Sequence, residues 1–354
     1  MNTFHTYLLR LIACAVFLFA GSLHISAQSH AWMQALPDDR PITTLCIPGA
    51  HDAATGEGLF SPIGLGVTQQ YTLAQLWDLG VRAFDLRPAV RDTTLHIYHG
   101  RLRIRMTFDQ AMLTICRKLA ENPSEFAVVI LREEVEAESD RERALWPHRV
   151  GQCLNRYSAY IAPLASGMQV RDLRGKILLL SRNDYTDTTL GGRVHGWSHS
   201  ADGSTDARIV PMNGSASIPL RVQDYYNTVG QERIAQKLSA VQSIIAASAS
   251  SLCQPVTGRA TSDTTDPVLT LNFLSAYATT WLRLPGMATA RGYLRNAEAV
   301  HHHVLSYLAA HPTSMPCGIH LLDFAGVDTI KRGGHTYSPL SGAVLKQIIE
   351  ENFR

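Results

Sequence analysis

The chain lacks a surplus of charge of either sign, and this excludes two classes of protein. Among its 354 residues, 32 Lys and Arg balance 30 Asp and Glu, which leaves a formal net charge of +2. A nucleic-acid-binding protein needs many Lys and Arg facing phosphates, so the balance argues against one. A disordered chain combines low hydrophobicity with high net charge, whereas 45% of these residues are hydrophobic and only 18% are charged. We therefore expect a folded protein with a sizeable core.

Cysteine is scarce, and no Cys-x-x-Cys pair occurs. Five of the six cysteines follow the N-terminal segment, at wide spacings: Cys46, Cys116, Cys153, Cys253 and Cys317. This spacing does not predict a zinc or redox site. An oxidising compartment would allow one or two disulfides among them, and the odd number leaves at least one thiol unpaired. The pairing stays open.

Only one long apolar run is present, near the N-terminus. Arg10 precedes the nearly unbroken apolar stretch Leu11–Ile25, and the small residues Ser26 and Ala27 follow it. This order is typical of a secretory signal peptide over residues 1–27, which predicts a secreted or periplasmic protein beginning at Gln28. An uncleaved membrane anchor is one alternative. A lipoprotein signal at Cys14 is another, although this cysteine comes early in the apolar run.

Short apolar segments alternate with helix-length segments over residues 28–354. This alternation predicts strand–helix units around a parallel sheet. We predict eight strands: Thr44–Ile47, Val81–Leu86, Leu95–Tyr98, Phe126–Leu131, Lys176–Ser181, Pro219–Val222, Val268–Phe273 and Gly318–Asp323. Eight strands with helical crossovers indicate a single α/β domain with a TIM-type (β/α)8 barrel. Because some gaps between strands are too short for a helix, we expect the barrel to be distorted and irregular.

Amphipathic helices are predicted between several of these strands. One begins at Thr107 with Gln110 three residues later, which is the pattern of a capping box. Apolar residues at three-to-four spacing predict four more: Arg141–Tyr157, Gln231–Ser248, Arg291–Ala310 and Pro339–Asn352. The stretch Asn183–Ser217 is rich in Gly, Ser, Thr and Asp, and we interpret it as a functional loop or a small insertion.

Ionisable residues follow the predicted strands at the ends where barrel enzymes carry their reactive groups. They are His51 and Asp52, Asp85 and Arg87, His99, the Arg132-Glu133-Glu134 run, Arg182 and Asp323. A single His at such a position is more often structural than catalytic, and a single Arg is usually a surface residue. Six strand ends that all finish in ionisable residues are not expected from packing alone, and they predict an acid–base site that receives an anion.

Eight segments in register resemble one known family. They are Ile47-Pro48-Gly49-Ala50-His51-Asp52, Gly80-Val81-Arg82-Ala83-Phe84-Asp85-Leu86-Arg87, Tyr98-His99-Gly100, Asn122-Pro123-Ser124-Glu125, Arg174-Gly175-Lys176, Val222-Gln223-Asp224-Tyr225-Tyr226, Leu271-Asn272-Phe273 and Leu321-Leu322-Asp323-Phe324. Together they span nearly the whole chain after Trp32. They are similar to the segments of the bacterial phosphatidylinositol-specific phospholipases C, the X-domain family.

The resemblance implies a phosphodiester cleavage that releases diacylglycerol and inositol 1,2-cyclic phosphate. It implies that His51 is the general base, oriented by Asp323, and that His99 is the general acid, supported by Asp52. It places Arg87 against the phosphoryl oxygens, with Asp85 holding the local charge network. An internal nucleophile needs a base, an acid and positive charge on the phosphate, and His can fill both proton roles near neutral pH.

The resemblance also implies contacts with inositol and with a membrane. The inositol positions are Arg132, Arg182, Asp224 and Tyr226, with Arg132 standing where a Lys occurs in the family. Two loop-like apolar stretches, Leu59–Leu65 and Trp281–Pro285, either pack on the barrel rim or insert into a membrane. Their candidate membrane-rim residues are Phe60, Leu65 and Trp281. The partner implied is a membrane surface containing phosphatidylinositol, with no cofactor and no obligate protein partner.

Two other functions compete with this one. The first is a calcium-dependent phosphodiesterase on the same barrel, against which Arg87 argues because calcium sites need oxygen ligands there. The second is a barrel that binds inositol headgroups or glycans without turnover, against which the complete acid–base set argues. No metal site is predicted. Consecutive residues such as His301-His302-His303 diverge on a helix, where we expect them partly exposed rather than sharing an ion.

The rim hypothesis predicts that Trp281→Ala weakens binding to phosphatidylinositol vesicles but spares hydrolysis of a soluble short-chain substrate. An interfacial side chain contributes to partitioning rather than to the chemical step. Vesicle sedimentation and turnover of the soluble substrate measure the two effects separately. Equal losses in both assays would show that Trp281 is a packing residue.

Overall fold

The computed structural model describes residues 29–59, 66–198, 204–214, 217–228, 231–252, 268–277 and 290–354. The predicted signal peptide and Cys14 lie outside these residues. Within the described part of the chain, every helix is too short or too polar to traverse a lipid bilayer.

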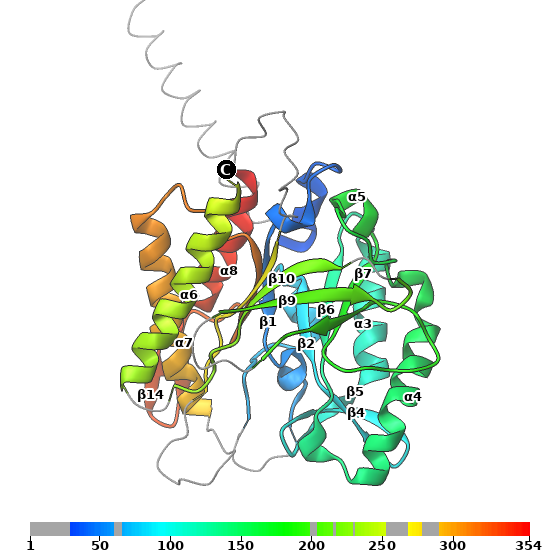
Figure 1. The fold of residues 1–354 in the computed structure, drawn as a ribbon. Coiled ribbons are helices and arrows are strands. Elements are labelled where there is room, and N and C mark those ends of the chain that lie inside the picture. The colour runs from blue at the N-terminus through cyan, green and yellow to red at the C-terminus, as the bar shows by residue number, and fades with distance from the viewer. Residues whose placement is uncertain are drawn as a thin grey trace, which may run out of the picture.

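A closed barrel forms the centre of the molecule (Figure 1). Its strands are β1 (Cys46–Ala50), β2 (Ala83–Leu86), β6 (Ala127–Leu131), β7 (Ile177–Ser181), β8 (Gly192–His195), β9 (Ser204–Pro211), β10 (Ile218–Gln223), β11 (Leu269–Phe273) and β12 (Gly318–Leu322). Their order around the barrel is β1-β12-β11-β10-β9-β8-β7-β6-β2. Neighbours are parallel except at β9, which runs antiparallel to both β8 and β10. The prediction of an α/β, irregular TIM-type barrel is confirmed.

The predicted strand Leu95–Tyr98 forms as part of β4 (Thr94–His99), but it does not belong to the barrel. It pairs with β3 (Pro88–Arg91) and β5 (Leu102–Thr107) in a separate antiparallel sheet. The turn between β3 and β4 uses Asp92 and Thr93, both at positive φ. A two-residue turn joins antiparallel strands, whereas a parallel partner would need a crossover of a dozen residues. The prediction was wrong on this point because the short connection leaves no room for a helix.

The stretch interpreted as a loop, Asn183–Ser217, contains β8 and β9 in its described part. Along β9, exposed and intermediate residues alternate through Ser204–Arg208, and Ile209 and Pro211 are buried. Polar residues predominate in β9 because one of its faces is turned toward solvent. The stretch therefore lacks the clear apolar alternation by which a strand is predicted from sequence. These two strands therefore complete the barrel where no strand was predicted.

Helices cover the outside of the barrel, with α3 and α4 on one side and α6, α7 and α8 on the other (Figure 1). The helices are α2 (Leu73–Asp78), α3 (Phe108–Glu121), α4 (Asp140–Arg156), α5 (Val170–Leu173), α6 (Gln231–Leu252), α7 (Ala290–Ala310) and α8 (Ser341–Glu350). All five predicted helices are present. The predicted capping box is formed, since the Thr107 side chain accepts from the Gln110 backbone and Gln110 accepts from the Thr107 backbone.

Short elements complete the fold. They are the 3-10 turns η1 (Ser29–Ala35), η2 (Ile42–Thr44), η3 (Ala53–Glu57), η4 (Val135–Ala137), η5 (Ser158–Tyr160) and η6 (Glu351–Phe353), and the hairpin β13 (Ile330–Arg332) and β14 (His335–Tyr337).

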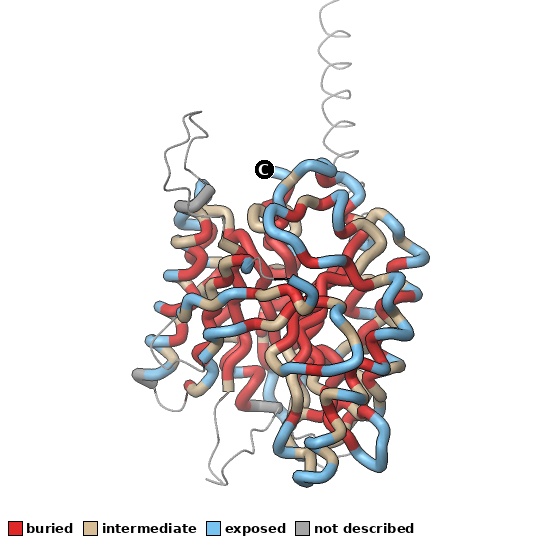
Figure 2. The backbone as a smooth tube through the Cα atoms, turned by 45° about the vertical axis from the view of Figure 1, so that its right-hand side comes forward, coloured by how far each residue is buried: buried red, intermediate tan, exposed pale blue. Residues whose placement is uncertain are grey.

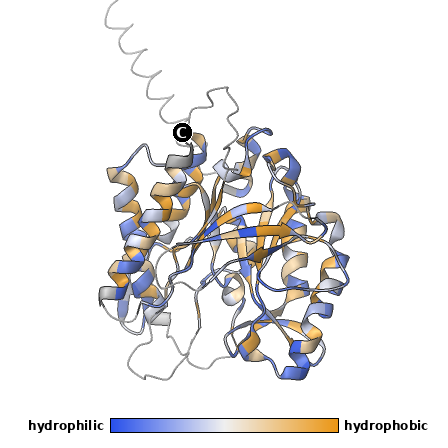
Figure 3. Ribbon diagram, in the orientation of Figure 1, coloured by the Kyte–Doolittle hydropathy of each residue, from blue (hydrophilic) through white to orange (hydrophobic). Residues whose placement is uncertain are grey.

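Six barrel strands are buried along their whole length, in line with the buried tube at the centre of the molecule in Figure 2: β1, β2, β6, β7, β11 and β12. In β6, Val128 and Ile130 belong to one apolar cluster, and Ala127, Val129 and Leu131 belong to a second cluster that also includes helix residues. Strands covered on both sides are apolar throughout, whereas the outer helices carry mixed polar and apolar faces (Figure 3). This double-sided core holds the strand ends in fixed positions.

The histidine run on α7 differs from its prediction at one residue. His301 is fully buried, and its Nδ1 lies within hydrogen-bond distance of the Pro339 carbonyl oxygen and of the Ser341 hydroxyl. His302 is exposed beside the Ser338 carbonyl. Packing of α7 against α8 covers His301, which the helix pattern alone did not indicate. The neighbouring rings have different partners, as expected for consecutive helix positions.

The described cysteines Cys46, Cys116, Cys153 and Cys317 are buried free thiols. The Sγ atoms of Cys46 and Cys317 lie 3.9 Å apart. Cys253 lies outside the described residues.

Candidate active site

Strand register places the reactive residues side by side. Ala50 at the end of β1 pairs with Leu322 of β12 and with Phe84 of β2. His51 follows Ala50, Asp323 follows Leu322 and Asp85 follows Phe84. The three side chains therefore start at the same level of the barrel. Gly49 makes this approach feasible, since a Cβ there would lie 2.5 Å from the Leu321 side chain.

His51 is oriented by two partners on opposite sides of its ring. Its Nδ1 lies 2.8 Å from Oδ1 of Asp323, and its Nε2 lies 2.8 Å from Nη2 of Arg87. Because a guanidinium only donates hydrogen bonds, Nε2 accepts and Nδ1 carries the proton that Asp323 accepts. In this tautomer Nε2 holds the lone pair that a general base needs. The ring is largely covered, with 13% of the side chain exposed.

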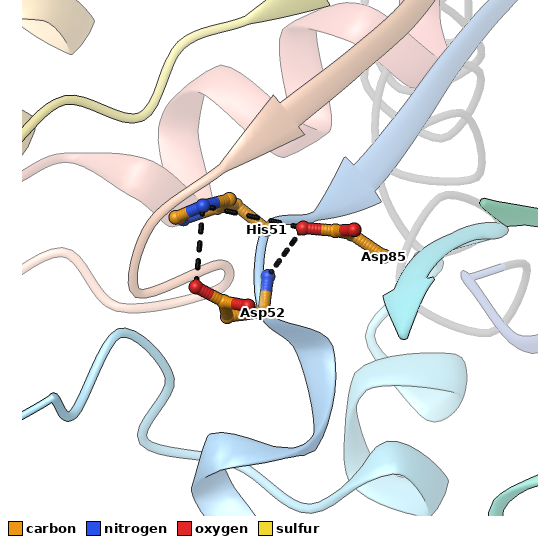
Figure 4. Close-up of side chains that lie close together, drawn as sticks. All are labelled: His51, Asp52 and Asp85. Carbon is orange, nitrogen blue, oxygen red and sulfur yellow. Dashed lines mark hydrogen bonds and ion pairs between the residues drawn. The ribbon is translucent and has the colours of Figure 1, made fainter. Parts of the chain in front are cut away.

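Arg87 lies among carboxylates at the floor of the site. Its Nε is 2.9 Å from Oδ1 of Asp52, its Nη2 is 2.8 Å from Oδ2 of Asp85, and its Nη1 is 3.9 Å from Oε2 of Glu134. Asp85 also accepts from the backbone N–H of Asp52, and Figure 4 shows His51, Asp52 and Asp85 turned toward one another. Asp52 adopts a left-handed conformation with φ of 43°, which Asp tolerates better than most residues. The arrangement fixes a positive charge beside His51.

His99 enters the site from outside the barrel, at the end of β4. Its Nδ1 lies 2.7 Å from the carbonyl oxygen of Gly66, and its Nε2 lies 3.4 Å from Oδ2 of Asp52. The same Asp52 oxygen is 3.3 Å from Nε2 of His51. The centroids of the two imidazole rings are 6.4 Å apart. Two histidines therefore direct their Nε2 atoms to one space, with the Arg87 guanidinium beside it.

The charges in this space perturb one another. Burial by itself would raise the pKa of Asp52, but Arg87 and the two histidines lower it to about 2. Burial disfavours a charged His51, yet the carboxylates of Asp52 and Asp323 outweigh burial and raise its pKa. Burial raises the pKa of Asp323, and the surrounding carboxylates raise the pKa of Arg87 well above its ordinary value. Arg87 is thus a permanent cation and Asp52 a permanent anion.

A second cluster adjoins the first. Nη1 of Arg182 lies 3.7 Å from Oδ2 of Asp224, and the same carboxylate oxygen accepts a hydrogen bond of 3.0 Å from Nε1 of Trp197. The Arg182 guanidinium also lies 3.9 Å from the centre of the Trp197 ring. Burial, with smaller contributions from the charges of Arg132 and Arg87, outweighs the opposing effect of Asp224 and lowers the pKa of Arg182 to about 10. The charges of the first cluster therefore act on the second.

The remaining predicted inositol residues border this cluster. Arg132 follows β6 and lowers the pKa of Asp52 through its charge. Tyr226 is 44% exposed, and its ring centre is 6.4 Å from that of Tyr277. The structure therefore brings Arg132, Arg182, Asp224 and Tyr226 to the same end of the barrel as the two histidines. Phe60, Leu65 and Trp281 lie outside the described residues.

Sequence reasoning missed three residues of the site. Trp197 was hidden in the stretch interpreted as a loop. Glu134 was noticed in its charged run but was given no role, although it is buried and burial raises its pKa. Tyr293 lies on α7 with its hydroxyl 3.2 Å from Nε2 of His99. An aromatic residue at a helical apolar position gives no signal of a catalytic contact, so only the structure reveals Tyr293.

Three residues of the first cluster, His51, Asp52 and Asp85, are close enough together to ligate a metal ion. Ligand atoms of His51, Asp52 and Asp85 lie within 4.8 Å of one another. The Arg87 guanidinium, however, lies against both carboxylates and against the histidine. A cation at this position would be repelled by a fixed positive charge. The two carboxylates and the histidine therefore suit an arginine better than a calcium ion.

Comparisons with known proteins find similar chains, although no family model matches. The chain is 32% identical to the 1-phosphatidylinositol phosphodiesterase of Listeria monocytogenes over 169 residues, which cover 45% of this chain and 50% of that protein. It is 23% identical to the Staphylococcus aureus (strain Newman) protein of the same name over 233 residues, which cover 63% of this chain and 71% of that protein. The chain thus matches only half the length of the Listeria relative.

Solved structures extend the likeness of fold to nearly the whole chain. The Listeria phosphatidylinositol-specific phospholipase C superposes with a TM-score of 0.61 at 24% identity, covering 91% of this chain and 98% of that one. A Staphylococcus aureus phosphatidylinositol-specific phospholipase C mutant gives a TM-score of 0.67 at 20% identity, covering 93% and 99%. The chain is similar to the bacterial phosphatidylinositol-specific phospholipases C. The predicted resemblance is confirmed in sequence and in fold.

The contact between His51 and Asp323 leads to a prediction that can be tested without an enzyme assay. In Asp323→Asn the amide oxygen can still accept from Nδ1, but the negative charge that favours the imidazolium is lost, so the pKa of His51 falls towards or below 6.5. NMR titration of the imidazole carbons measures this value. Asp328→Asn is the control, because it removes the same charge from an exposed residue in the same segment between β12 and β13. An unchanged pKa in Asp323→Asn would contradict the assigned pairing.

Proposed function

We propose that this chain is a phospholipase C that cleaves phosphatidylinositol to diacylglycerol and inositol 1,2-cyclic phosphate. The observation that carries the proposal is the pair of histidines whose Nε2 atoms share one Asp52 oxygen, at 3.3 and 3.4 Å, beside the Arg87 guanidinium. Phosphodiester cleavage by an internal hydroxyl needs a base, an acid and a fixed positive charge, and this space holds all three. The similarity to bacterial phosphatidylinositol-specific phospholipases C supports the same reaction.

His51 acts as the base in this proposal. Its Nε2 takes the proton of the inositol 2-hydroxyl, whose oxygen then forms a bond with phosphorus. The imidazolium that results is stabilised by Asp323 at 2.8 Å, the partner that also holds the ring in the correct tautomer. Arg87 donates to the phosphoryl oxygens as negative charge develops on them, and Asp85 keeps the guanidinium in place at 2.8 Å.

His99 acts as the acid. As the bond between phosphorus and the diacylglycerol oxygen breaks, Nε2 of His99 gives its proton to that oxygen. The carbonyl of Gly66 holds Nδ1, so the reactive nitrogen is the one that faces the site. Asp52 is ionised, and its Oδ2 lies 3.4 Å from Nε2 of His99, where it can accept a hydrogen bond from the N–H that His99 transfers.

The second cluster binds the inositol ring in this proposal. A cyclitol presents hydroxyls around its edge and C–H groups on its faces. Arg132, Arg182 and Asp224 offer charged hydrogen-bond partners for the edge, and the exposed Tyr226 ring offers a surface for the face. Trp197 holds Arg182 and Asp224 in position through its ring and its Nε1.

The proposed enzyme works on a membrane surface after export. The segment 1–27 supports a secreted or periplasmic location, with lipoprotein anchoring at Cys14 as the alternative. The apolar residues Phe60, Leu65 and Trp281, predicted from the sequence to lie at the membrane rim, support interfacial binding. Solved structures of the Staphylococcus aureus phosphatidylinositol-specific phospholipase C, which has a similar fold, address the modulation of its membrane binding. Glycosylphosphatidylinositol anchors present the same inositol phosphodiester and form a second substrate class of this proposal.

The two histidines provide the direct test. His51→Ala and His99→Ala should each lower the turnover of phosphatidylinositol vesicles by about 10²–10⁴-fold, because a general acid or base typically contributes that much. Release of the water-soluble headgroup, followed by phosphorus NMR of the cyclic product, measures the reaction. Circular dichroism checks that both variants are folded. Retention of more than about a tenth of the activity in either folded variant would be incompatible with the assigned roles.

The position of Arg87 predicts independence from metal ions. Millimolar chelator should leave wild-type activity unchanged, because the guanidinium supplies the charge compensation that a divalent ion supplies elsewhere. Arg87→Ala should be severely impaired, and calcium should give little rescue. Arg87→Asp joins Asp52 and Asp85 in a cluster of three carboxylates, and we expect weak calcium-stimulated activity. Loss of wild-type activity in chelator with recovery in calcium would overturn the metal-independent mechanism.

A further inference from the structure

Tyr293 contacts His99 from outside the eight segments that carry the family resemblance. It lies in the first turns of α7, and its hydroxyl oxygen is 3.2 Å from Nε2 of His99. The two rings are tilted by 52° with centroids 5.8 Å apart, and Tyr293 is 3% exposed. The contact is therefore made by a buried hydroxyl directed at the nitrogen that faces the site.

The protonation chemistry of His99 gives this hydroxyl a specific task. The Gly66 carbonyl only accepts, so Nδ1 of His99 always carries a proton and Nε2 alternates between a bare lone pair and an N–H. Asp52 is a carboxylate and only accepts hydrogen bonds, so it can pair with Nε2 of His99 only when that nitrogen carries a proton. A phenol both donates and accepts, and Tyr293 can pair with Nε2 in either state.

Packing holds the Tyr293 hydroxyl in place. Its ring belongs to an apolar cluster that joins α7 to the segment after β12: Tyr293, Leu294, Ala297, Phe324, Val327 and Tyr337. Phe324 follows Asp323, the partner of His51. Burial raises the pKa of Tyr293 well above its ordinary value, and the negative charges of Asp52 and Asp323 raise it further, so the hydroxyl keeps its proton.

We propose that Tyr293 is a positioning residue for His99, which fixes the direction of Nε2 toward the leaving oxygen together with the Gly66 carbonyl. This inference rests on the proposed function. Among the described residues, loss of the hydroxyl leaves a neutral His99 with its hydrogen bond to the Gly66 carbonyl and without a donor that fixes the direction of Nε2. The effect is confined to the step in which His99 gives up its proton.

The experiment varies the leaving group. A diacylglycerol alkoxide needs a proton as it departs, whereas a phenolate of low basicity departs without one. Tyr293→Phe should therefore lower kcat on a short-chain phosphatidylinositol by about five- to tenfold, the factor expected for one hydrogen bond. On an aryl ester of inositol 1-phosphate, the same variant should stay within about twofold of wild type, because that substrate bypasses the general acid.

Matched variants make the result interpretable. Phe keeps the ring and its packing, and thermal unfolding checks the fold of the variant. Tyr307→Phe removes a hydroxyl from the same helix, where the ring stacks on His311 at 4.3 Å, and it should leave both reactions unchanged. His99→Ala should reproduce the selective loss on the alkyl substrate, to a larger extent.

The outcomes separate this inference from the proposed function. Equal losses on both substrates would show a general structural effect of Tyr293, and no loss on either would show an idle contact; each result overturns the inference while the proposed function stands. A wild-type protein that turns over neither substrate would overturn the proposed function and the inference with it. A selective loss on the alkyl substrate supports the role of Tyr293.

Discussion

The parallel register that joins β1 to β12 and to β2 determines where the reactive groups lie. Ala50 pairs with Leu322 on one side and with Phe84 on the other, so the residues that follow come out at one level. A shift of one residue would turn each side chain to the opposite face of its strand. Gly49 allows the three strands to approach closely, and apolar packing on both faces resists any slip. The site depends on this alignment before it depends on any single side chain.

A buried cation is stable in the site only because several carboxylates surround it. Arg87 is covered from solvent, and removal from water costs a charge several kcal/mol unless it is paired. Asp52, Asp85 and Glu134 provide the pairing. Arg87 and the two histidines in turn keep Asp52 ionised, and Asp52 together with Asp323 raises the pKa of His51. One local set of charges thus stabilises the guanidinium, lies beside both histidines and keeps the guanidinium next to His51.

The helices and most barrel strands could be predicted because local patterns determine them. The capping box at Thr107 is a contact between residues three apart, and the apolar runs of β6 and β7 are long enough to identify buried strands. The assignments of β4 and of the Asn183–Ser217 stretch failed for a different reason. Whether β4 joins the barrel depends on the strands with which it pairs. β8 and β9 carry too few apolar residues to be predicted as strands from their own sequence.

The sequence alone determined the residue types of the site and their places at strand ends, and it indicated the family that the chain resembles. These properties follow from short motifs such as the one that ends in His51 and Asp52, where order along the chain is enough. Only the tertiary structure decided that His99 enters from outside the barrel, that Trp197 joins Arg182 to Asp224, and that Tyr293 reaches His99. Tyr293 and His99 are 194 positions apart, and a contact over that distance depends on how the elements pack rather than on any local pattern.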